Sequence, residues 1–265
     1  MSANIKLEQL QESLRTRRLG KRIFFSREVS STSDWAKELA KKGAEEGTVT
    51  VALVQTAGRG RLGREWISPR GGLWFSIVLR PDRKASDAMK LVFVASMVVA
   101  EVLNEKYGLR TETKWPNDVL VNGKKICGIL AEMNTKGEKV NYVILGVGVN
   151  ANFCADDVFS EPMRTTATSV QDELGKEIPL ESLLRALLEE MERSYDRYVK
   201  AGFVPLLEKW KRHAGFLGHT VMVTDQNERL KGLALDVDPE GALILRLEDG
   251  TARRIVVGDV VLVGH

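Results

Sequence analysis

Three arginines and three glycines occupy seven consecutive positions, Gly58 to Arg64, within the stretch VQTAGRGRLGREW. Guanidinium groups form charge-assisted hydrogen bonds with phosphates and carboxylates, and glycine N–H groups can approach the same anion closely. Such a segment could bind a phosphate, act as a nucleic-acid arm or be a solvated linker. Apolar strands are predicted on both sides, and Gln55 and Trp66 bracket the run. This setting favours an anion-binding loop over a linker.

The common nucleotide-binding motifs do not account for this loop. Gly58, Gly60 and Gly63 fit the G-x-G-x-x-G pattern of dinucleotide-binding loops, which must open a helix. Here REWISPRGG follows, and its proline and glycines prevent a helix. A protein-kinase loop requires valine where Glu65 stands, and no H-R-D sequence occurs in the chain. The G-K-S/T of a Walker loop is absent as well.

A second group of residues lies in ETKWPNDVLVNGKKICGILAEM, where Lys114 precedes a rigid Trp-Pro turn and Asn117 and Asp118 follow it. A lysine at a strand end is usually exposed and solvated, and the Trp-Pro pair can be a strand end packed on the core. A lysine beside an Asn-Asp pair also suits a site for anions, with Asp118 as a candidate ligand for a divalent cation. These residues alone leave both interpretations open.

A third group is the SSTSDW segment. Ser31, with Asp34 three residues on, is typical of a helix N-cap. The same helix start also presents hydroxyl and N–H groups that could bind a polar ligand.

Strands must position most of these residues. Runs rich in β-branched and aromatic residues predict strands over residues 21–29, 48–55, 72–81 and 140–150 and a hairpin over 119–133, where Asn122-Gly123 suits a type I′ turn. Helical spacing predicts helices from residue 7 to near Gly20 and over 30–43, 86–107, 182–200 and 203–215. Since strand follows strand without helices between them, we expect an α+β fold with a mixed, mostly antiparallel sheet and helices packed on one face.

The pattern changes after Gly215 to short alternating strands with turns near residues 225–226, 238–241 and 248–250, which predicts a small SH3-like β-barrel at the C-terminal end. We therefore expect a lead-in over residues 1–20, a main domain over 21–214 that carries all three groups of residues, and the barrel over 215–265. An appendage that only stabilises the protein is the simplest role for such a barrel.

The composition narrows the class of protein. The 265 residues carry a formal net charge of +3, which is too small to indicate a nucleic-acid-binding surface. Two cysteines, Cys127 and Cys154, give no disulfide framework and favour a reducing cytoplasm. The first residues have no apolar segment typical of a signal peptide, and the longest apolar run, Leu91 to Leu103, is too short to span a membrane.

Taken together, GRGRLGREW, KWPNDVLVNGKKICGILAE, GVGVN and the SST segment resemble the biotin–protein ligase family, in the order and spacing of that family, over nearly the whole chain. There are two departures. Ser33 stands where the family commonly has asparagine. About twenty residues precede the predicted catalytic domain, too few for the helix-turn-helix domain of members that also act as transcriptional repressors. The resemblance is therefore to the monofunctional type, for which no DNA binding is expected.

The resemblance implies a reaction in two steps. Biotin and ATP give biotinyl-5′-AMP and pyrophosphate, and a lysine of a biotin carboxyl carrier protein then takes the biotinyl group. Magnesium would enter with the ATP phosphates, with Asp118 as a weak candidate ligand. The resemblance also implies a homodimer.

The resemblance assigns roles to particular residues. Lys114 and Arg59 would be catalytic, because they would neutralise charge that builds up as two anions are brought together. Biotin would be bound by Ser31, Thr32, Ser33, Gln55, Gly58, Arg59, Gly60, Arg61, Lys114 and Gly128. ATP and the adenylate would be bound by Arg59, Arg61, Trp66, Lys114, Asn117 and Asn150, with Trp66 stacked on adenine.

Two other functions compete with this prediction. Lipoate–protein ligases use the same type of reaction, so the acyl substrate is one open choice. A nucleic-acid-binding regulator would explain the basic loop, but it leaves the motif around Lys114 and the nearly balanced charge unexplained.

Overall fold

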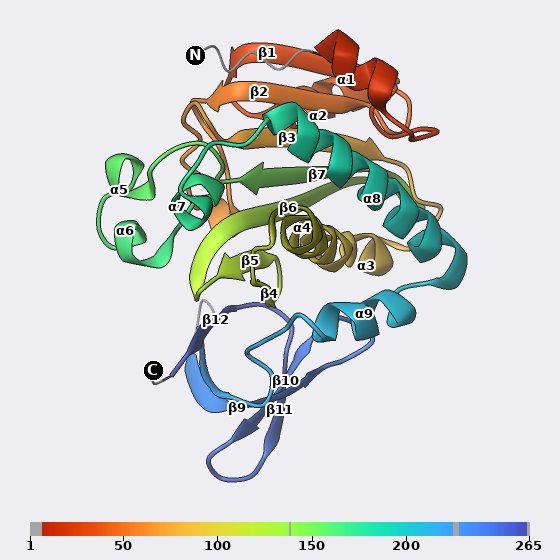
Figure 1. Ribbon diagram of the computed structural model, residues 1–265. Helices are drawn as coiled ribbons and strands as arrows, with labels where there is room; N and C mark the ends of the chain where they lie inside the picture. Colours follow the sequence, from red (N-terminus) through yellow and green to blue (C-terminus); the bar gives the residue numbers. More distant parts are fainter. Residues whose placement is uncertain (1–6, 138, 225–227, 264–265) are drawn as a thin grey trace.

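The computed structural model describes residues 7–137, 139–224 and 228–263, which form two β-sheets with helices around the larger one (Figure 1). The larger sheet has the strand order β1-β2-β3-β7-β6-β5-β4, and the smaller has the order β11-β10-β9-β8-β12. The larger sheet consists of β1 (Ile23–Val29), β2 (Val49–Gln55), β3 (Leu73–Leu79), β4 (Thr111–Lys114), β5 (Asp118–Val121), β6 (Lys124–Lys136) and β7 (Lys139–Val149). The smaller consists of β8 (Thr220–Thr224), β9 (Arg229–Val237), β10 (Leu243–Leu247), β11 (Ala252–Ile255) and β12 (Asp259–Leu262).

The α+β fold class predicted from the sequence is confirmed. In the larger sheet β1 and β2 are parallel, while the other neighbouring strands pair antiparallel. The described helices are α1 (Leu7–Ser13), α2 (Thr32–Lys41), α3 (Ala85–Ala88), α4 (Leu91–Tyr107), α5 (Ala155–Val158), α6 (Met163–Thr166), α7 (Val170–Leu174), α8 (Leu180–Ala201) and α9 (Val204–Lys211). None of these described helices is long and apolar enough to cross a membrane.

Helices lie against both faces of the larger sheet, not one face as expected. Alternate residues of β3 separate the two layers, since side chains along a strand point to opposite faces. Phe75 and Ile77 belong to the main core with α4 and α8, whereas Val78 packs with Ala36 and Ala40 of α2 in a separate cluster. Because α2 covers only part of its face, the rest of that face is left for a cavity.

Three glycines form a strip without side chains on the α2 face of the central strands. In the register of the sheet, Gly128 pairs with Gly148, Trp74 also pairs with Gly148, and Ser76 pairs with Gly146. Paired residues point to the same face, so the three glycines lie together on the α2 side.

Two of the predicted helices differ most from their expected bounds. The N-terminal helix ends at Ser13, and the chain beyond it is held by Glu192 of α8, whose carboxylate accepts hydrogen bonds from the backbone N–H groups of Arg17, Arg18 and Leu19. The helix expected over 86–107 is interrupted between α3 and α4.

The smaller sheet packs directly on the larger part of the molecule. Trp115 Nε1 donates a hydrogen bond to the carbonyl oxygen of Gly241 at 3.0 Å, and Phe216 packs on Trp210 with ring centroids 6.2 Å apart. Residues of both sheets belong to one hydrophobic core. Gly241 and Gly250 adopt positive φ at the predicted turns, while the turn expected at 225–226 lies outside the described residues.

Candidate functional site

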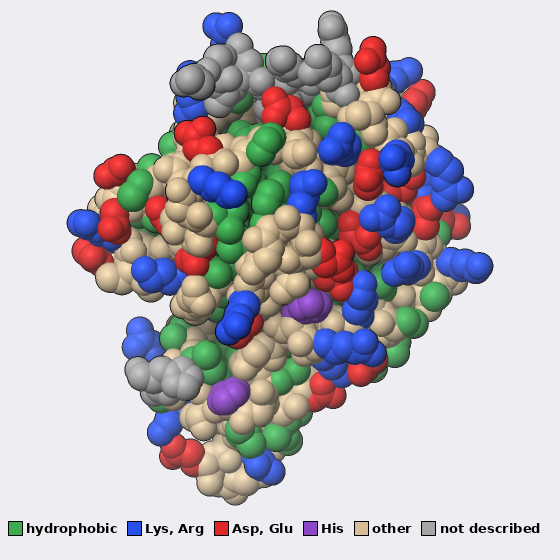
Figure 2. Space-filling view, in the orientation of Figure 1, with side chains coloured by type: hydrophobic (Ala, Val, Ile, Leu, Met, Phe, Trp, Pro, Cys, Tyr) green, Lys and Arg blue, Asp and Glu red, His purple; other side chains and the backbone are tan. Residues whose placement is uncertain are grey.

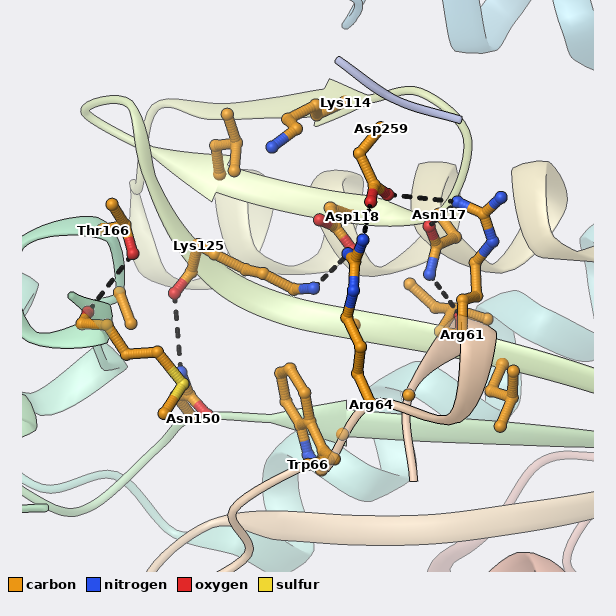
Figure 3. Close-up of a pocket in the computed structure, with 18 of the residues that line it drawn as sticks. Arg61, Arg64, Trp66, Lys114, Asn117, Asp118, Lys125, Asn150, Thr166 and Asp259 are labelled. Atoms are coloured by element: carbon orange, nitrogen blue, oxygen red, sulfur yellow. Dashed lines mark hydrogen bonds and ion pairs between the residues drawn. The ribbon is translucent and has the colours of Figure 1, made fainter. Parts of the chain in front are cut away.

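A cavity of about 620 Å³ opens on the α2 face of the larger sheet, beside the glycine strip. It is bounded by the start of α2, the loop between β2 and β3, the ends of β4 and β5, the central strands β6 and β7, and β12 of the smaller sheet. The close-up in Figure 3 shows the part of it where basic side chains gather.

The residues predicted from the sequence come together in this cavity, with one exception. Gly58 does not line it. A Cβ at Gly58 would lie 2.3 Å from the carbonyl oxygen of Trp66, so this glycine allows the two ends of the loop to pack closely. The predicted residues that line the cavity are Ser31, Thr32, Ser33, Gln55, Arg59, Gly60, Arg61, Trp66, Lys114, Asn117, Asp118, Gly128 and Asn150.

One end of the cavity is a network of hydroxyl and amide groups at the start of α2. Ser31 caps the helix by accepting a hydrogen bond from Asp34 N. Thr32 donates through both its N–H and its Oγ1 to Gln55 Oε1, at 2.8 and 3.0 Å. The hydroxyls of Thr32 and Ser33 both contact Ser76 Oγ, at 2.8 and 3.0 Å. This end can exchange hydrogen bonds with a small polar ring.

The middle of the cavity is formed by Trp66 lying on the glycine strip. A Cβ at Gly148 would lie 2.4 Å from Trp66 Nε1, and one at Gly128 would lie 3.0 Å from Trp66 Cζ3. Lys125 Nζ lies 5.1 Å from the ring centroid on the indole, a cation–π contact. The indole can therefore lie against the sheet only because these two strand positions carry no side chain.

The buried donor Trp66 Nε1 and the buried acceptor Asn150 Oδ1, both beside the cavity, have neither a hydrogen bond nor an ion pair within the described part of the chain. The amide of Asn150 is oriented by its Nδ2 group, which donates to the carbonyl oxygen of Thr168 at 2.9 Å. A buried polar group without a partner costs roughly 1–3 kcal/mol. These atoms are therefore suited to a ligand that has polar groups of its own.

The other end of the cavity is basic, with Arg61, Arg64, Lys114 and Lys125 close to one another (Figure 3). Arg64 Nη2 lies 2.5 Å from Asp259 Oδ2, and Lys125 Nζ lies 2.7 Å from Asp118 Oδ1. Burial lowers the pKa of Arg61, although the charge of Asp259 opposes that change. Four cations in one cavity make it a site for an anionic group.

Lys114 differs from its basic neighbours. Its ammonium group makes no hydrogen bond or ion pair with any residue that the structure describes, and the residue is half-buried rather than exposed as a strand-end lysine would usually be. Burial holds its pKa below the ordinary value of 10.5, while the charge of Asp118 works in the opposite direction. This ammonium group is free to interact with an anion in the cavity.

Arg59, the other residue predicted to be catalytic, is directed toward α2 and β6. Its two terminal nitrogens bind both carboxylate oxygens of Asp34 at 2.5 Å, and Nη2 lies 3.7 Å from Glu132 Oε2. The hydrogen bond with Arg59 lowers the pKa of Asp34, and the same bond raises the pKa of Arg59. The two predicted catalytic cations are thus in different electrostatic settings.

The side chains that the structure describes do not form a resident magnesium site. Among the described residues there is no cluster of three or more His, Cys, Asp or Glu side chains that could hold a metal ion. Asp118, the candidate ligand from the sequence, is paired with Lys125.

Several lining residues were not assigned to the site from the sequence, among them Lys125, Gly146, Gly148 and Asp259, and Arg64 was included only as part of the predicted anion-binding loop. The alternating glycines of GVGVN carried a signal, because residues two apart on a strand share a face. Asp259 carried none, since nothing local connects β12 with a loop almost two hundred residues earlier.

Two protein-family models match the sequence of this chain. A model of the Biotin/lipoate A/B protein ligase family matches residues 25–150, and one of the Biotin protein ligase C terminal domain matches residues 216–263. The biotin–[acetyl-CoA-carboxylase] ligase of Paracoccus denitrificans is 37% identical over 231 residues, which is 86% of this chain and 95% of that protein. The chain belongs to the biotin/lipoate protein ligase family.

Other proteins are similar to this chain over most of its length. The bifunctional ligase/repressor BirA of Bacillus subtilis is 36% identical over 255 residues, covering 96% of this chain and 78% of that protein. Among solved structures, the biotin protein ligase of Aquifex aeolicus in complex with biotin and ATP superposes with a TM-score of 0.78 at 28% identity, over 91% of this chain and 98% of that one.

Proposed function

We propose that this chain activates biotin with ATP and transfers the biotinyl group to a lysine of a biotin carboxyl carrier protein. The observation that carries the proposal is the division of the cavity: a hydroxyl and amide network at one end, a basic group at the other, and a glycine strip between them. Two small molecules, one with a polar ring and one with phosphates, can therefore meet in the middle. The similarity to proteins named as biotin ligases supports this assignment.

In the first step a carboxylate oxygen of biotin attacks the α-phosphorus of ATP, and pyrophosphate leaves. Both reactants are anions, so the attack requires positive charge close to the bond that forms. Lys114 supplies that charge because its ammonium group has no competing ion pair among the described residues. In the second step the carrier's lysine amine attacks the carbonyl carbon of biotinyl-5′-AMP, AMP leaves, and the amine loses a proton.

The remaining groups orient the two substrates. Ser31, Thr32, Ser33 and Gln55 face the ring system of biotin. Asn150 Oδ1, a fixed and unpaired acceptor, suits the exocyclic amino group of adenine, and Trp66 suits its ring. Arg61 belongs with the phosphate of the adenylate, together with Asn117, which Arg61 contacts at 3.3 Å.

Magnesium, the homodimer, the closed SH3-like barrel and a cytoplasmic location belong to this proposal as predictions. Magnesium would accompany the ATP phosphates rather than occupy a protein site, in keeping with the pairing of Asp118. The absence of DNA binding also remains a prediction. On the face shown in Figure 2, basic and acidic side chains are intermingled, unlike the basic stripe that nucleic-acid binding favours.

The test is pyrophosphate release from ATP by the purified chain, with biotin or lipoate added separately. We expect release with biotin and little with lipoate, followed by labelling of a biotin carboxyl carrier domain. Release with lipoate alone would show that the chain is the lipoate-specific kind of ligase. No release with either acid would reject the proposal.

A further inference from the structure

Asp259 is the first residue of β12 and belongs to the smaller sheet, yet its carboxylate lies among the basic residues of the cavity (Figure 3). The strand that carries it is fixed by pairing with β8, in which Asp259 is opposite Thr224 and Val260 is opposite Val223. Both valines are almost fully buried. The carboxylate therefore projects from a rigid element rather than from a free loop.

The two oxygens of Asp259 bind different arginines of the same loop. Oδ2 lies 2.5 Å from Arg64 Nη2, and Oδ1 lies 3.5 Å from Arg61 Nη1. Arg61 Nη1 is also 3.2 Å from the carbonyl oxygen of Gly258. Arg59, the third arginine of the loop, is held from the other side by Asp34. Each arginine of the loop is thus anchored, two of them by the smaller sheet.

These contacts leave donors available for a ligand. A guanidinium group has five N–H donors, and the ion pairs with Asp259 use a single nitrogen of each arginine. The side chain of Arg61 is only 20% exposed and faces the cavity, whereas that of Arg64 is 62% exposed and would point into solvent without a partner. Long basic side chains lose considerable rotamer freedom when they are ordered. A fixed carboxylate removes that entropic cost before the nucleotide binds.

We propose that Asp259 is a positioning residue, which holds Arg61 and Arg64 over the basic end of the cavity so that their free donors can bind the phosphates of ATP and of the adenylate. This inference rests on the proposed function. It gives the smaller sheet a specific part in nucleotide binding, beyond stabilising the protein.

The main test is Asp259→Asn, which keeps the shape of the side chain and removes its charge. We expect the KM for ATP to rise about tenfold and pre-formed adenylate to dissociate faster by a similar factor, as for the loss of a partly exposed ion pair that orders a binding group. The kcat and the KM for biotin should change much less, because Lys114 and the start of α2 are untouched. Asp259→Glu keeps the negative charge, so it should retain part of the wild-type affinity for ATP.

A matched control variant distinguishes a positioning role of Asp259 from a general loss of stability in the smaller sheet. Asp238 lies in the turn between β9 and β10 of the same sheet, and its carboxylate binds Arg254 at 2.5 Å and two backbone N–H groups. Asp238→Asn removes more hydrogen bonds than Asp259→Asn but none near the loop, so it should leave the KM for ATP unchanged. In a double variant, Asp259→Asn with Arg64→Gln, the rise in the KM for ATP should be smaller than the product of the two single effects, because Asp259 acts partly through Arg64.

Trypsin cleavage after Arg61 and Arg64 provides a readout that does not depend on activity. Asp259→Asn should be cut faster at these bonds than the wild type or Asp238→Asn, without any substrate present. Equal cleavage, or a KM for ATP that is unchanged or lower in Asp259→Asn, would overturn the inference. If the wild type releases no pyrophosphate with biotin, the proposed function fails, while the cleavage rates still decide the role of Asp259.

Discussion

Among the residues of the cavity, Lys114 stands apart because its charge has no paired carboxylate within the described chain, whereas Arg61, Arg64 and Lys125 are each ion-paired. We expect Lys114→Ala to slow adenylate formation by about a hundredfold to a thousandfold, as for the loss of one group that stabilises transition-state charge. The free energy of unfolding should not fall, since a half-buried ammonium without an ion pair contributes no favourable pairing. Pyrophosphate release and urea unfolding measure the two effects. Release at the wild-type rate would contradict the role.

The pH dependence of adenylation tests the same residue. Burial lowers the pKa of Lys114 below 10.5, so the charged form is lost at a lower pH than for an ordinary lysine. The rate should therefore fall as pH rises through that lowered pKa. Lys114→Arg keeps its charge over the whole range, because arginine does not deprotonate in proteins. Its alkaline decline should lie at higher pH, and identical profiles for the two proteins would show that Lys114 does not set this limit.

Two glycines on β7 distinguish the two ends of the cavity. A Cβ at Gly148 would lie 2.4 Å from Trp66 Nε1, and one at Gly146 would lie 2.7 Å from Ser33 Oγ. We expect Gly148→Ala to raise mainly the KM for ATP and Gly146→Ala mainly the KM for biotin, each by about tenfold, since either methyl group displaces a neighbour by a modest strain. Each variant is the other's control. An equal effect of both on one substrate would mean that the ends are wrongly assigned.

The sequence predicted the site residues that belong to distinctive local motifs. Ser31 was predicted as a helix cap and Lys114 as a strand-end cation, and both line the cavity. The partners of these residues were harder to find. Asp34 was identified only as part of the cap, because its bond with Arg59 depends on how the loop returns over α2 after 25 residues.

The end of a strand or helix could be predicted from the sequence where residues at that end determine it. The hairpin of β5 and β6 turns at Asn122 and Gly123, whose φ angles are 51° and 77°, as the sequence indicated. The break between α3 and α4 has no proline or glycine. There Lys90 N donates to Asp87 O, and Lys90 Nζ lies over the ring of Phe203. The contact with Phe203 is tertiary and cannot be predicted from helical spacing.

The carboxylate of Glu192 on α8 accepts hydrogen bonds from three consecutive backbone N–H groups of the N-terminal segment. Burial alone would raise the pKa of Glu192, but the backbone N–H groups of Arg17, Leu19 and Arg18 hold it below the ordinary 4.5. Its stabilising contribution is therefore complete above 4.5 and is lost as pH falls through the lowered value. We expect Glu192→Gln to cost about 2 kcal/mol at neutral pH, because one oxygen that accepts hydrogen bonds becomes an NH₂ group.

Urea unfolding at neutral pH and below pH 4.5 measures this contribution. The difference in the free energy of unfolding between the wild type and Glu192→Gln should become smaller in acid. Glu189→Gln on the same helix is the control, since Glu189 accepts a single, more exposed bond from Arg15 N at 3.1 Å and should matter less. A constant gap at both pH values would mean that the carboxylate charge is not what holds the segment.

At the scale of the whole molecule, the two sheets share one core although the sequence suggested a boundary near residue 215. Val221, Val223 and Val260 of the smaller sheet belong to the same buried cluster as α4 and α8, and Phe216 joins them to Trp210. The hydrophobic pattern predicted each sheet, but pairing between distant segments depends on tertiary packing. This shared core predicts that the two sheets unfold in one cooperative transition.

The distribution of tryptophan makes that prediction directly measurable. All five tryptophans precede residue 211, so their fluorescence reports mainly on the larger part of the molecule, with Trp115 in contact with Gly241 between β9 and β10. Val223→Ala truncates a side chain that is 2% exposed within the smaller sheet, at a cost of about 2 kcal/mol. We expect the fluorescence midpoint to fall by roughly 5 °C together with the far-ultraviolet dichroism midpoint, although no tryptophan lies in the altered sheet. Were the smaller sheet independent, dichroism would show an early phase while the fluorescence midpoint stayed at its wild-type value.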